Sequence, residues 1–201
     1  MYTLLEIPAL TPRSIELDPP LSDDEFERLS ERSDFARFER SREGTILMNP
    51  PAGALTSSGN IEVVWQLKNW WMQHRRGMVL GCDAGFFLPD GSMLNPDAAY
   101  VPQEQLEGLT HKQLERFLRL APAFIMELRS PSDRLAACKE KMAAWMANGV
   151  AVGWLVDPKS RKVYIYEQGA APRIESGKAV AGTGPVAGFV LDLQAVWRCF
   201  E

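Results

Sequence analysis

Two carboxylates and a cation lie where apolar segments end, and they are the residues of this sequence best suited to chemistry. Asp97 follows a proline in "NPDAAYVP", Glu127 closes the apolar run "APAFIME", and Arg129 comes two residues later. Carboxylate oxygens are the ligands that Mg²⁺ prefers, and a metal held in this way can activate water and stabilise a phosphate under attack. A nearby lysine or arginine would help to orient the nucleophile. The pattern therefore favours metal-dependent phosphodiester chemistry.

Each of these residues also has a purely structural explanation. An aspartate after a proline can cap a turn, as Asp97 would. An unpaired carboxylate at the edge of a core is costly, so Glu127 could instead belong to an ion pair. Arg129 alternates to the same side of the strand as Glu127. A salt bridge to a neighbouring acid and a contact with a phosphate both remain open for it.

A strand and a helix would position Glu127. The apolar run over residues 122–128 predicts a buried interior strand, and the segment after it predicts a helix over residues 133–148 packed on that strand. Ser132 suits the N-cap of this helix, and Gly149 suits its end. One apolar stripe at helical spacing supports the helix: Leu135, Cys138, Met142, Trp145 and Met146.

The remaining segments predict an α/β protein. A capping box at Ser22 and Glu25 begins a short helix, "GTILMNPP" suits a strand, and a longer helix is expected from Ser57. Residues 78–102 have the pattern of a β-meander, and residues 150–166 that of a hairpin around Asp157. This order favours a mixed central β-sheet flanked by helices. We expect residues 1–20 to form an N-terminal arm and residues 21–201 a single domain.

The composition excludes several classes of function and of metal site. The 201 residues carry a net charge of −4, which argues against coating nucleic acid by charge alone but not against a nuclease with an acidic metal site. Three scattered cysteines give neither a disulfide framework nor a zinc pair, and two histidines exclude a histidine-rich metal site. No apolar run reaches the roughly 20 residues of a membrane span, so we expect a cytoplasmic protein without membrane contact.

The ordered motifs resemble those of a known nuclease superfamily. Pro96-Asp97 followed by Glu127-Leu128-Arg129 resembles the PD-(D/E)XK motif of the restriction-endonuclease-like fold. More narrowly, the chain is similar to the Uma-type endonuclease family of bacteria over roughly residues 45–195. The matching segments are "TILMNPPAG", "GFFLPDGSMLNPDAAYV", "FIMELRSPSD", "KMAAWMANGVAVGWLVDPKSRKVYIY" and "GFVLDL". The resemblance implies a nuclease that cleaves DNA with Mg²⁺ or Mn²⁺ bound to Asp97 and Glu127.

One motif position departs from the superfamily pattern. Arg129 stands where a lysine is expected, and an arginine can bind phosphate but cannot serve as a base. In this family the lysine is shifted to the following helix, which matches Lys141. Lys139 and Lys141 flank the apolar stripe on opposite sides, so periodicity does not choose between them. The resemblance thus implies a catalytic set of Asp97, Glu127, Lys141 and Arg129.

Two further expectations concern activity and assembly. An alternative stays open: an inactive nuclease fold that binds nucleic acid or a protein partner. It is supported by the arginine at the third motif position and by the net negative charge of the chain. Because cleavage of both DNA strands commonly uses two sites related by two-fold symmetry, we expect a homodimer.

Five other polar residues are weaker candidates for the site. Asn60 is better explained as a helix-start residue, although it could reach the site. Asp83 is expected on a strand of unknown facing. Ser130, Ser132 and Asp133 are mainly capping residues.

Overall fold

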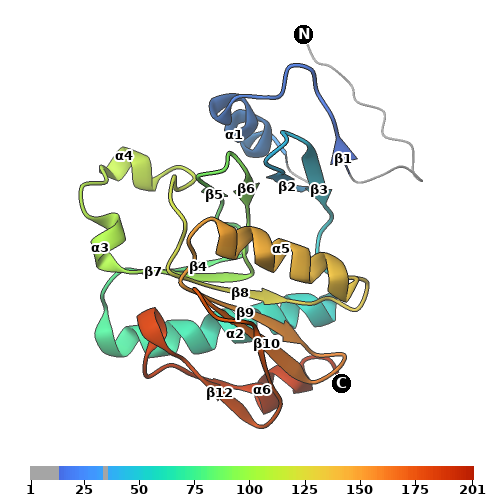
Figure 1. Ribbon diagram of the computed structural model, residues 1–201, viewed down its shortest axis with the longest axis vertical. Coiled ribbons are helices and arrows are strands. Elements are labelled where there is room, and N and C mark those ends of the chain that lie inside the picture. The colour runs from blue at the N-terminus through green and yellow to red at the C-terminus, as the bar shows by residue number, and fades with distance from the viewer. Residues whose placement is uncertain (1–13, 34–35) are drawn as a thin grey trace.

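The computed structural model of the chain describes residues 14–33 and 36–201 (Figure 1). Its central sheet has six strands in the order β11-β10-β9-β8-β7-β4. Their bounds are β4 Met78–Gly81, β7 Ala98–Val101, β8 Phe124–Leu128, β9 Val152–Asp157, β10 Lys162–Glu167 and β11 Arg173–Glu175. β8 pairs parallel with β9 and antiparallel with β7. The predicted mixed sheet, with the segment 122–128 as an interior strand, is therefore confirmed.

Helices cover both faces of this sheet. α2 (Ala54–His74) packs against β4, β7 and β8, and α5 (Leu135–Ala147) packs against β9 and β10. The alternation of β8 explains the two layers, because Met126 belongs to the core beneath α2 and Ile125 to the core beneath α5. Every residue of β8 is buried. The apolar residues Phe124, Ile125 and Met126 suit a strand that is covered on both faces.

The C-terminal part completes the layer of α2. β12 (Ala179–Ala181) and β13 (Val190–Asp192) form a two-stranded sheet, and α6 (Leu193–Arg198) follows β13 directly. A 3₁₀ turn, η1 (Gly184–Val186), lies between the two strands, and α2 contacts both β13 and α6. Earlier in the chain, α3 (Gln103–Leu106) and α4 (His111–Leu114) are short helices that follow β7.

A second sheet lies above the first in Figure 1. Its order is β1-β3-β2-β6-β5, with bounds β1 Ser14–Ile15, β2 Arg37–Arg40, β3 Ile46–Asn49, β5 Phe86–Phe87 and β6 Met93–Leu94. The sequence predicts β3 but not its partner β2. Phe26 of α1 (Asp23–Glu31) packs with Phe38, Ile46, Phe87 and Met93 in a separate small core.

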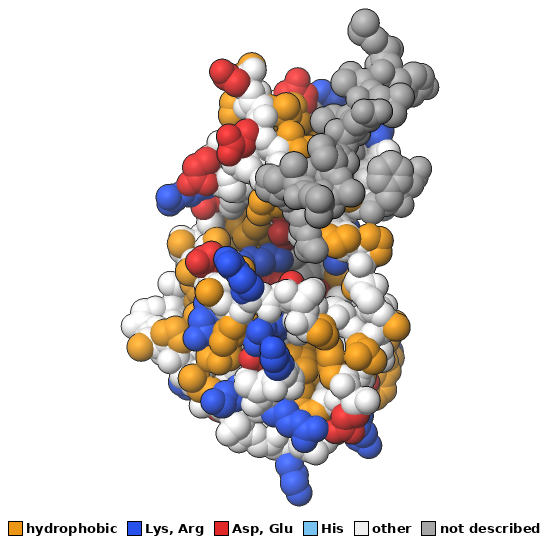
Figure 2. All heavy atoms as spheres, turned by 90° about the vertical axis from the view of Figure 1, so that its right-hand side faces the viewer, with side chains coloured by type: hydrophobic (Ala, Val, Ile, Leu, Met, Phe, Trp, Pro, Cys, Tyr) orange, Lys and Arg blue, Asp and Glu red, His pale blue; other side chains and the backbone are white. Residues whose placement is uncertain are grey.

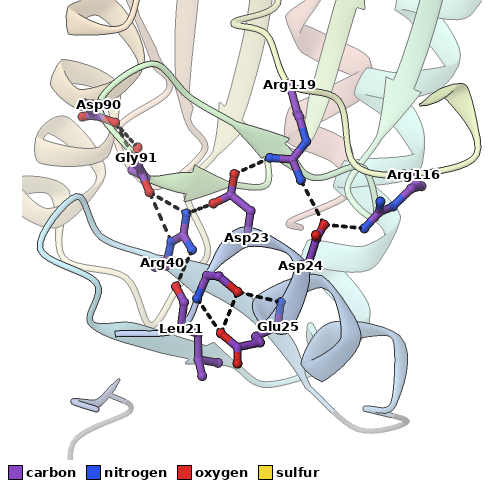
Figure 3. Close-up of polar contacts among 11 residues, drawn as sticks. Leu21, Asp23, Asp24, Glu25, Arg40, Asp90, Gly91, Arg116 and Arg119 are labelled. Carbon is purple, nitrogen blue, oxygen red and sulfur yellow. Dashed lines mark hydrogen bonds and ion pairs between the residues drawn. The ribbon is translucent and has the colours of Figure 1, made fainter. Parts of the chain in front are cut away.

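Polar contacts fix α1 on this second sheet (Figure 3). The predicted capping box is confirmed: the amide of Glu25 donates to Ser22 Oγ at 3.4 Å, and the amide of Ser22 donates to Glu25 Oε2 at 2.9 Å. Asp23 pairs with Arg40 of β2 and with Arg119. The first turn of α1 is thus held by ion pairs with two separate segments.

Four local expectations need correction. Residues 78–102 do not form a β-meander, because β4 pairs directly with β7 while β5 and β6 belong to the second sheet. Ser132 is not the N-cap of α5, because Asp133 and Ser130 close a turn through mutual backbone and side-chain bonds, and the helix begins only after Arg134. α2 begins at Ala54, three residues before Ser57. Asp83 lies in a turn after β4 rather than on a strand.

Gly149, by contrast, follows the end of α5 with φ +98°, as predicted.

Of the predicted N-terminal arm, residues 1–13 lie outside the described residues, and Ser14–Ile15 pair with β3. None of the helices within 14–33 and 36–201 is long and apolar enough to cross a membrane.

Candidate active site

Glu127 lies near the end of β8 and is buried. Two residues of α5, four positions apart and hence on one face of the helix, contact its carboxylate. Trp145 Nε1 donates to Glu127 Oε1 at 2.8 Å. Lys141 Nζ lies 3.0 Å from Oε1 and 3.1 Å from Oε2. The strand sets the position of the carboxylate, and the helix sets its orientation.

Asp97 immediately precedes β7 and reaches the same end of β8. Because β7 and β8 are antiparallel with Ala98 opposite Met126, the residue before Ala98 lies across from the residues after Met126. The amide of Leu128 donates to Asp97 Oδ2 at 2.7 Å, and Asn60 Nδ2 donates to Oδ1 at 3.0 Å. Asn60 is therefore part of the site, although its place in the sequence suggested a helix-start residue.

Sequence reasoning missed one carboxylate of the site. Glu39 of β2 is 5% exposed and accepts hydrogen bonds from the amide of Asn95 at 3.0 Å and from Asn49 Nδ2 at 3.1 Å. Lys141 Nζ lies 2.8 Å from Glu39 Oε1, so the ammonium bridges Glu39 and Glu127. The one signal was the alternation in "ARFER", where Phe38 is apolar and its neighbours are charged.

The site carries more buried negative than positive charge. Asp97, Glu127 and Glu39 bring three carboxylates, and Lys141 brings one ammonium, which leaves a charge of −2 when all four are ionised. Burial raises the pKa of Glu127 to about 8, and the charges of Asp97 and Glu39 act in the same direction. Burial also raises the pKa of Asp97.

The same carboxylates favour the charged form of Lys141. Burial by itself would lower the pKa of the Lys141 ammonium, but Glu127, Glu39 and Asp97 together hold it above its ordinary value. Burial would likewise raise the pKa of Glu39, yet the adjacent ammonium lowers it overall. Lys141 is consequently a permanent cation at neutral pH, and Glu39 is its ionised partner.

This donor set fits a hydrated divalent cation. Mg²⁺ is usually held by one or two carboxylates, with water and substrate oxygens completing its shell. Asn60 Oδ1 and Asn95 Oδ1 are buried and lack a hydrogen-bond partner within the described residues, so each can accept from a metal-bound water. Within the same residues no three acidic, histidine or cysteine side chains form a ready metal cluster. Asp97 and Glu127 are the two carboxylates that would hold the ion, and its charge would offset the excess of −2.

The side chains line an open pocket of about 1260 Å³. Asp97, Glu127, Glu39, Lys141 and Arg129 are among its lining residues. The pocket opens between the two sheets at the edge where β8 ends. Figure 2 shows the molecule from that side, with lysine and arginine side chains gathered over the lower half of the face. Space for a substrate therefore adjoins the carboxylates.

The other residues that the sequence singled out differ in whether they line the pocket. Lys139 does not line the pocket, and its Nζ lies 4.5 Å from the ring centre of Tyr164. Arg129 forms the salt bridge that the sequence left open: Nη1 donates to Asp157 Oδ1 and Oδ2 at 3.2 and 3.0 Å. Its Nε and Nη2 donate to the carbonyl oxygen of Asp133 at 3.1 and 3.0 Å. Ser130, Ser132 and Asp133 line the pocket, whereas Asp83 does not.

A mixed sheet with two carboxylates at adjoining strand ends, and a lysine from the next helix, defines a restriction-endonuclease-like α/β protein. The fold has a solved counterpart in the crystal structure of a "putative nuclease" from Anabaena variabilis, with a TM-score of 0.72 and 16% sequence identity. The match covers 90% of this chain and 100% of that one.

The family model named Uma2, described as "Putative restriction endonuclease", matches residues 23–194. The chain belongs to this family, as the resemblance of its motifs indicated. No curated protein matches the chain.

Proposed function

We propose that the protein is a metal-dependent endonuclease that hydrolyses DNA phosphodiester bonds. Membership of a family described as restriction endonucleases supports nuclease function in general. The observation that carries the finer proposal is the convergence of Asp97 and Glu127 on one pocket with excess buried negative charge. A divalent cation would neutralise that charge and bring DNA phosphates to carboxylates that would otherwise repel them.

Each residue of the site has a role in this proposal. Asp97 and Glu127 would hold Mg²⁺ or Mn²⁺, which supplies water activation and charge neutralisation at the phosphate when bound. Asn60 and the Leu128 amide fix the Asp97 carboxylate, and Trp145 fixes that of Glu127.

The two cations of the motif have different tasks. Lys141 stays protonated, so it would hold the attacking water or a phosphate oxygen rather than abstract a proton. Glu39 also binds the Lys141 ammonium and so helps Glu127 to position it. Arg129 has five N–H donors, and its bonds to Asp157 and Asp133 leave one Nη2–H for a phosphate oxygen.

Nicking of supercoiled plasmid tests the proposal. The wild type should convert the plasmid to open circles with Mg²⁺ or Mn²⁺ and not with EDTA. Asp97→Ala should lose about 100-fold or more of this activity, since it removes a ligand of the metal. Equal nicking by the wild type and Asp97→Ala would point to a contaminating nuclease and sink the assignment.

A second candidate function is an inactive nuclease fold that binds nucleic acid or a protein partner. It is favoured by the ammonium of Lys141, which already bridges Glu127 and Glu39, and by Arg129 at the motif position of a lysine. Duplex binding without nicking by either metal would support this alternative.

Assembly follows from the proposed reaction. One site cleaves one strand, so scission of both strands favours a homodimer with two-fold symmetry. Light scattering coupled to size-exclusion chromatography should give about twice the mass of 22.5 kDa. A monomer that nicks plasmid but does not linearise it would contradict the dimer while leaving the nuclease proposal intact.

A further inference from the structure

The turn between β9 and β10 is basic. Lys159 and Arg161 lie in the turn and Lys162 begins β10, and all three side chains are exposed. Arg161 pairs with Glu201 at 2.8 Å. Neither Lys159 nor Lys162 has an ion-pair partner in the part of the chain that the structure describes. Two exposed charges in this turn are therefore available to an anionic partner.

This turn lies at the same edge of the sheet as the candidate site. β8 and β9 run parallel with Glu127 opposite Leu155, and the amide of Arg129 continues the ladder to the carbonyl of Val156 at 2.9 Å. Asp157 is two residues beyond Leu155, so the turn begins about 7 Å along the strand from the level of Glu127. Figure 1 shows the β9–β10 turn and the start of α5 on the same side of the molecule.

The turn is held in a fixed position by a buried carboxylate. Asp157 is 0% exposed and accepts hydrogen bonds from Ser160 Oγ at 2.7 Å and from the amide of Lys159 at 3.2 Å. Arg129 donates to both of its oxygens. The residue at the third motif position thus connects the end of β8 to the basic turn. An anchored pair of lysines loses less freedom on binding than a pair on a mobile loop.

We propose that this turn is a contact surface for the sugar-phosphate backbone of the DNA duplex, an inference that rests on the proposed function. Lys159 and Lys162 each neutralise a phosphate on the flank of the one that is cleaved. Phosphates recur about every 3.4 Å along the axis of a strand, so the turn lies about two phosphates away from the level of Glu127. Arg129 is a positioning residue for this surface. This role gives a physical reason for an arginine at that motif position, because the planar guanidinium can donate to Asp157 and to the Asp133 carbonyl at the same time.

The salt dependence of DNA binding tests the surface. Affinity for a short duplex is measured by fluorescence anisotropy at one fixed concentration of Ca²⁺, a divalent cation that also takes oxygen ligands, between about 50 and 200 mM salt, where each phosphate contact contributes a slope of about −0.9 in log K against log salt. Lys159→Gln and Lys162→Gln should each bind several-fold more weakly and each lower the magnitude of the slope by about 0.9. Lys112→Gln is the matched control, since this exposed lysine belongs to α4, a helix on the left of Figure 1, away from the β9–β10 turn.

The outcomes test the DNA-contact surface and the nuclease function separately. Reduced slopes for the two turn variants, with Lys112→Gln equal to the wild type, support the proposal. Slopes equal to the wild type in both turn variants overturn it, and so does the same reduction in Lys112→Gln. If the wild type nicks plasmid in that case, the proposed function stands and only the surface is wrong. If the wild type neither binds nor nicks DNA, both fail together.

Discussion

At the level of single residues, Lys141 and Lys139 differ in what they contact, although they are two positions apart on α5. Lys141 Nζ bridges Glu127 and Glu39, whereas Lys139 lies over the ring of Tyr164 outside the pocket. We therefore expect Lys141→Ala to lower plasmid nicking by about 100-fold or more, and Lys139→Ala to retain the rate of the wild type. Loss of activity in Lys139→Ala alone would reverse the residue assignment without affecting the fold.

A second residue-level prediction separates stability from activity at Glu127. The charged form of this carboxylate is buried near two other carboxylates, so its ionisation costs free energy in the metal-free protein. Glu127→Gln keeps the shape of the side chain and removes one negative charge. At pH 9 without metal, the variant should melt at the same temperature as the wild type or higher, while plasmid nicking is lost. A clear fall in its melting temperature under these conditions would contradict the charge assignment.

At the level of elements, the ends of β8 and β9 are tied by a buried ion pair. Arg129 compensates Asp157, whose side chain is fully buried. Arg129→Leu leaves that carboxylate without its cation, which typically costs about 3–5 kcal/mol. Urea denaturation should show a loss of this size in the free energy of unfolding. The double variant Arg129→Leu/Asp157→Leu should recover most of it, because no unpaired charge remains.

The sequence predicted these elements unevenly. The strand at 122–128 and the helix after it were recognisable, because a strand buried on both faces and a helix with one apolar stripe leave strong patterns. β2 left almost no pattern, since it has four residues and alternates charged with apolar side chains. Glu39 was missed for that reason. The convergence of Asp97 with Glu127 and the choice of Lys141 over Lys139 were both inferred from motif resemblance, because helical periodicity did not separate the two lysines.

At the level of the whole molecule, stability should depend on both pH and metal. The pKa of Glu127 is about 8 in the folded protein against 4.5 as its ordinary value, so between these pH values the folded state binds a proton that the unfolded state has released. This group therefore makes the metal-free protein less stable as the pH rises through that window. Burial raises the pKa of Asp97 as well, which acts in the same sense.

A bound divalent cation should remove this dependence. Calorimetry of the metal-free protein should give a melting temperature that falls from pH 6 to pH 9, and Mn²⁺ should flatten the fall. Because the metal needs the ionised carboxylate, binding at pH 7 should release a proton, detectable as a heat that varies with the ionisation enthalpy of the buffer. Asp97→Ala should weaken the metal response. A melting temperature that rises with pH in the wild type without metal would contradict the assigned pKa.

The bond from Trp145 to Glu127 has one more consequence. The indole ring is fully buried and its N–H points at the carboxylate, so the magnetic environment of that single proton depends on whether the oxygen beside it is charged, protonated or bound to a metal. In a ¹H–¹⁵N spectrum the six tryptophans each contribute one indole signal, and loss of a peak in Trp145→Phe identifies the relevant one. The chain thus contains a native spectroscopic reporter, beside the Glu127 carboxylate, of its protonation and of any ion bound to it before any substrate is added.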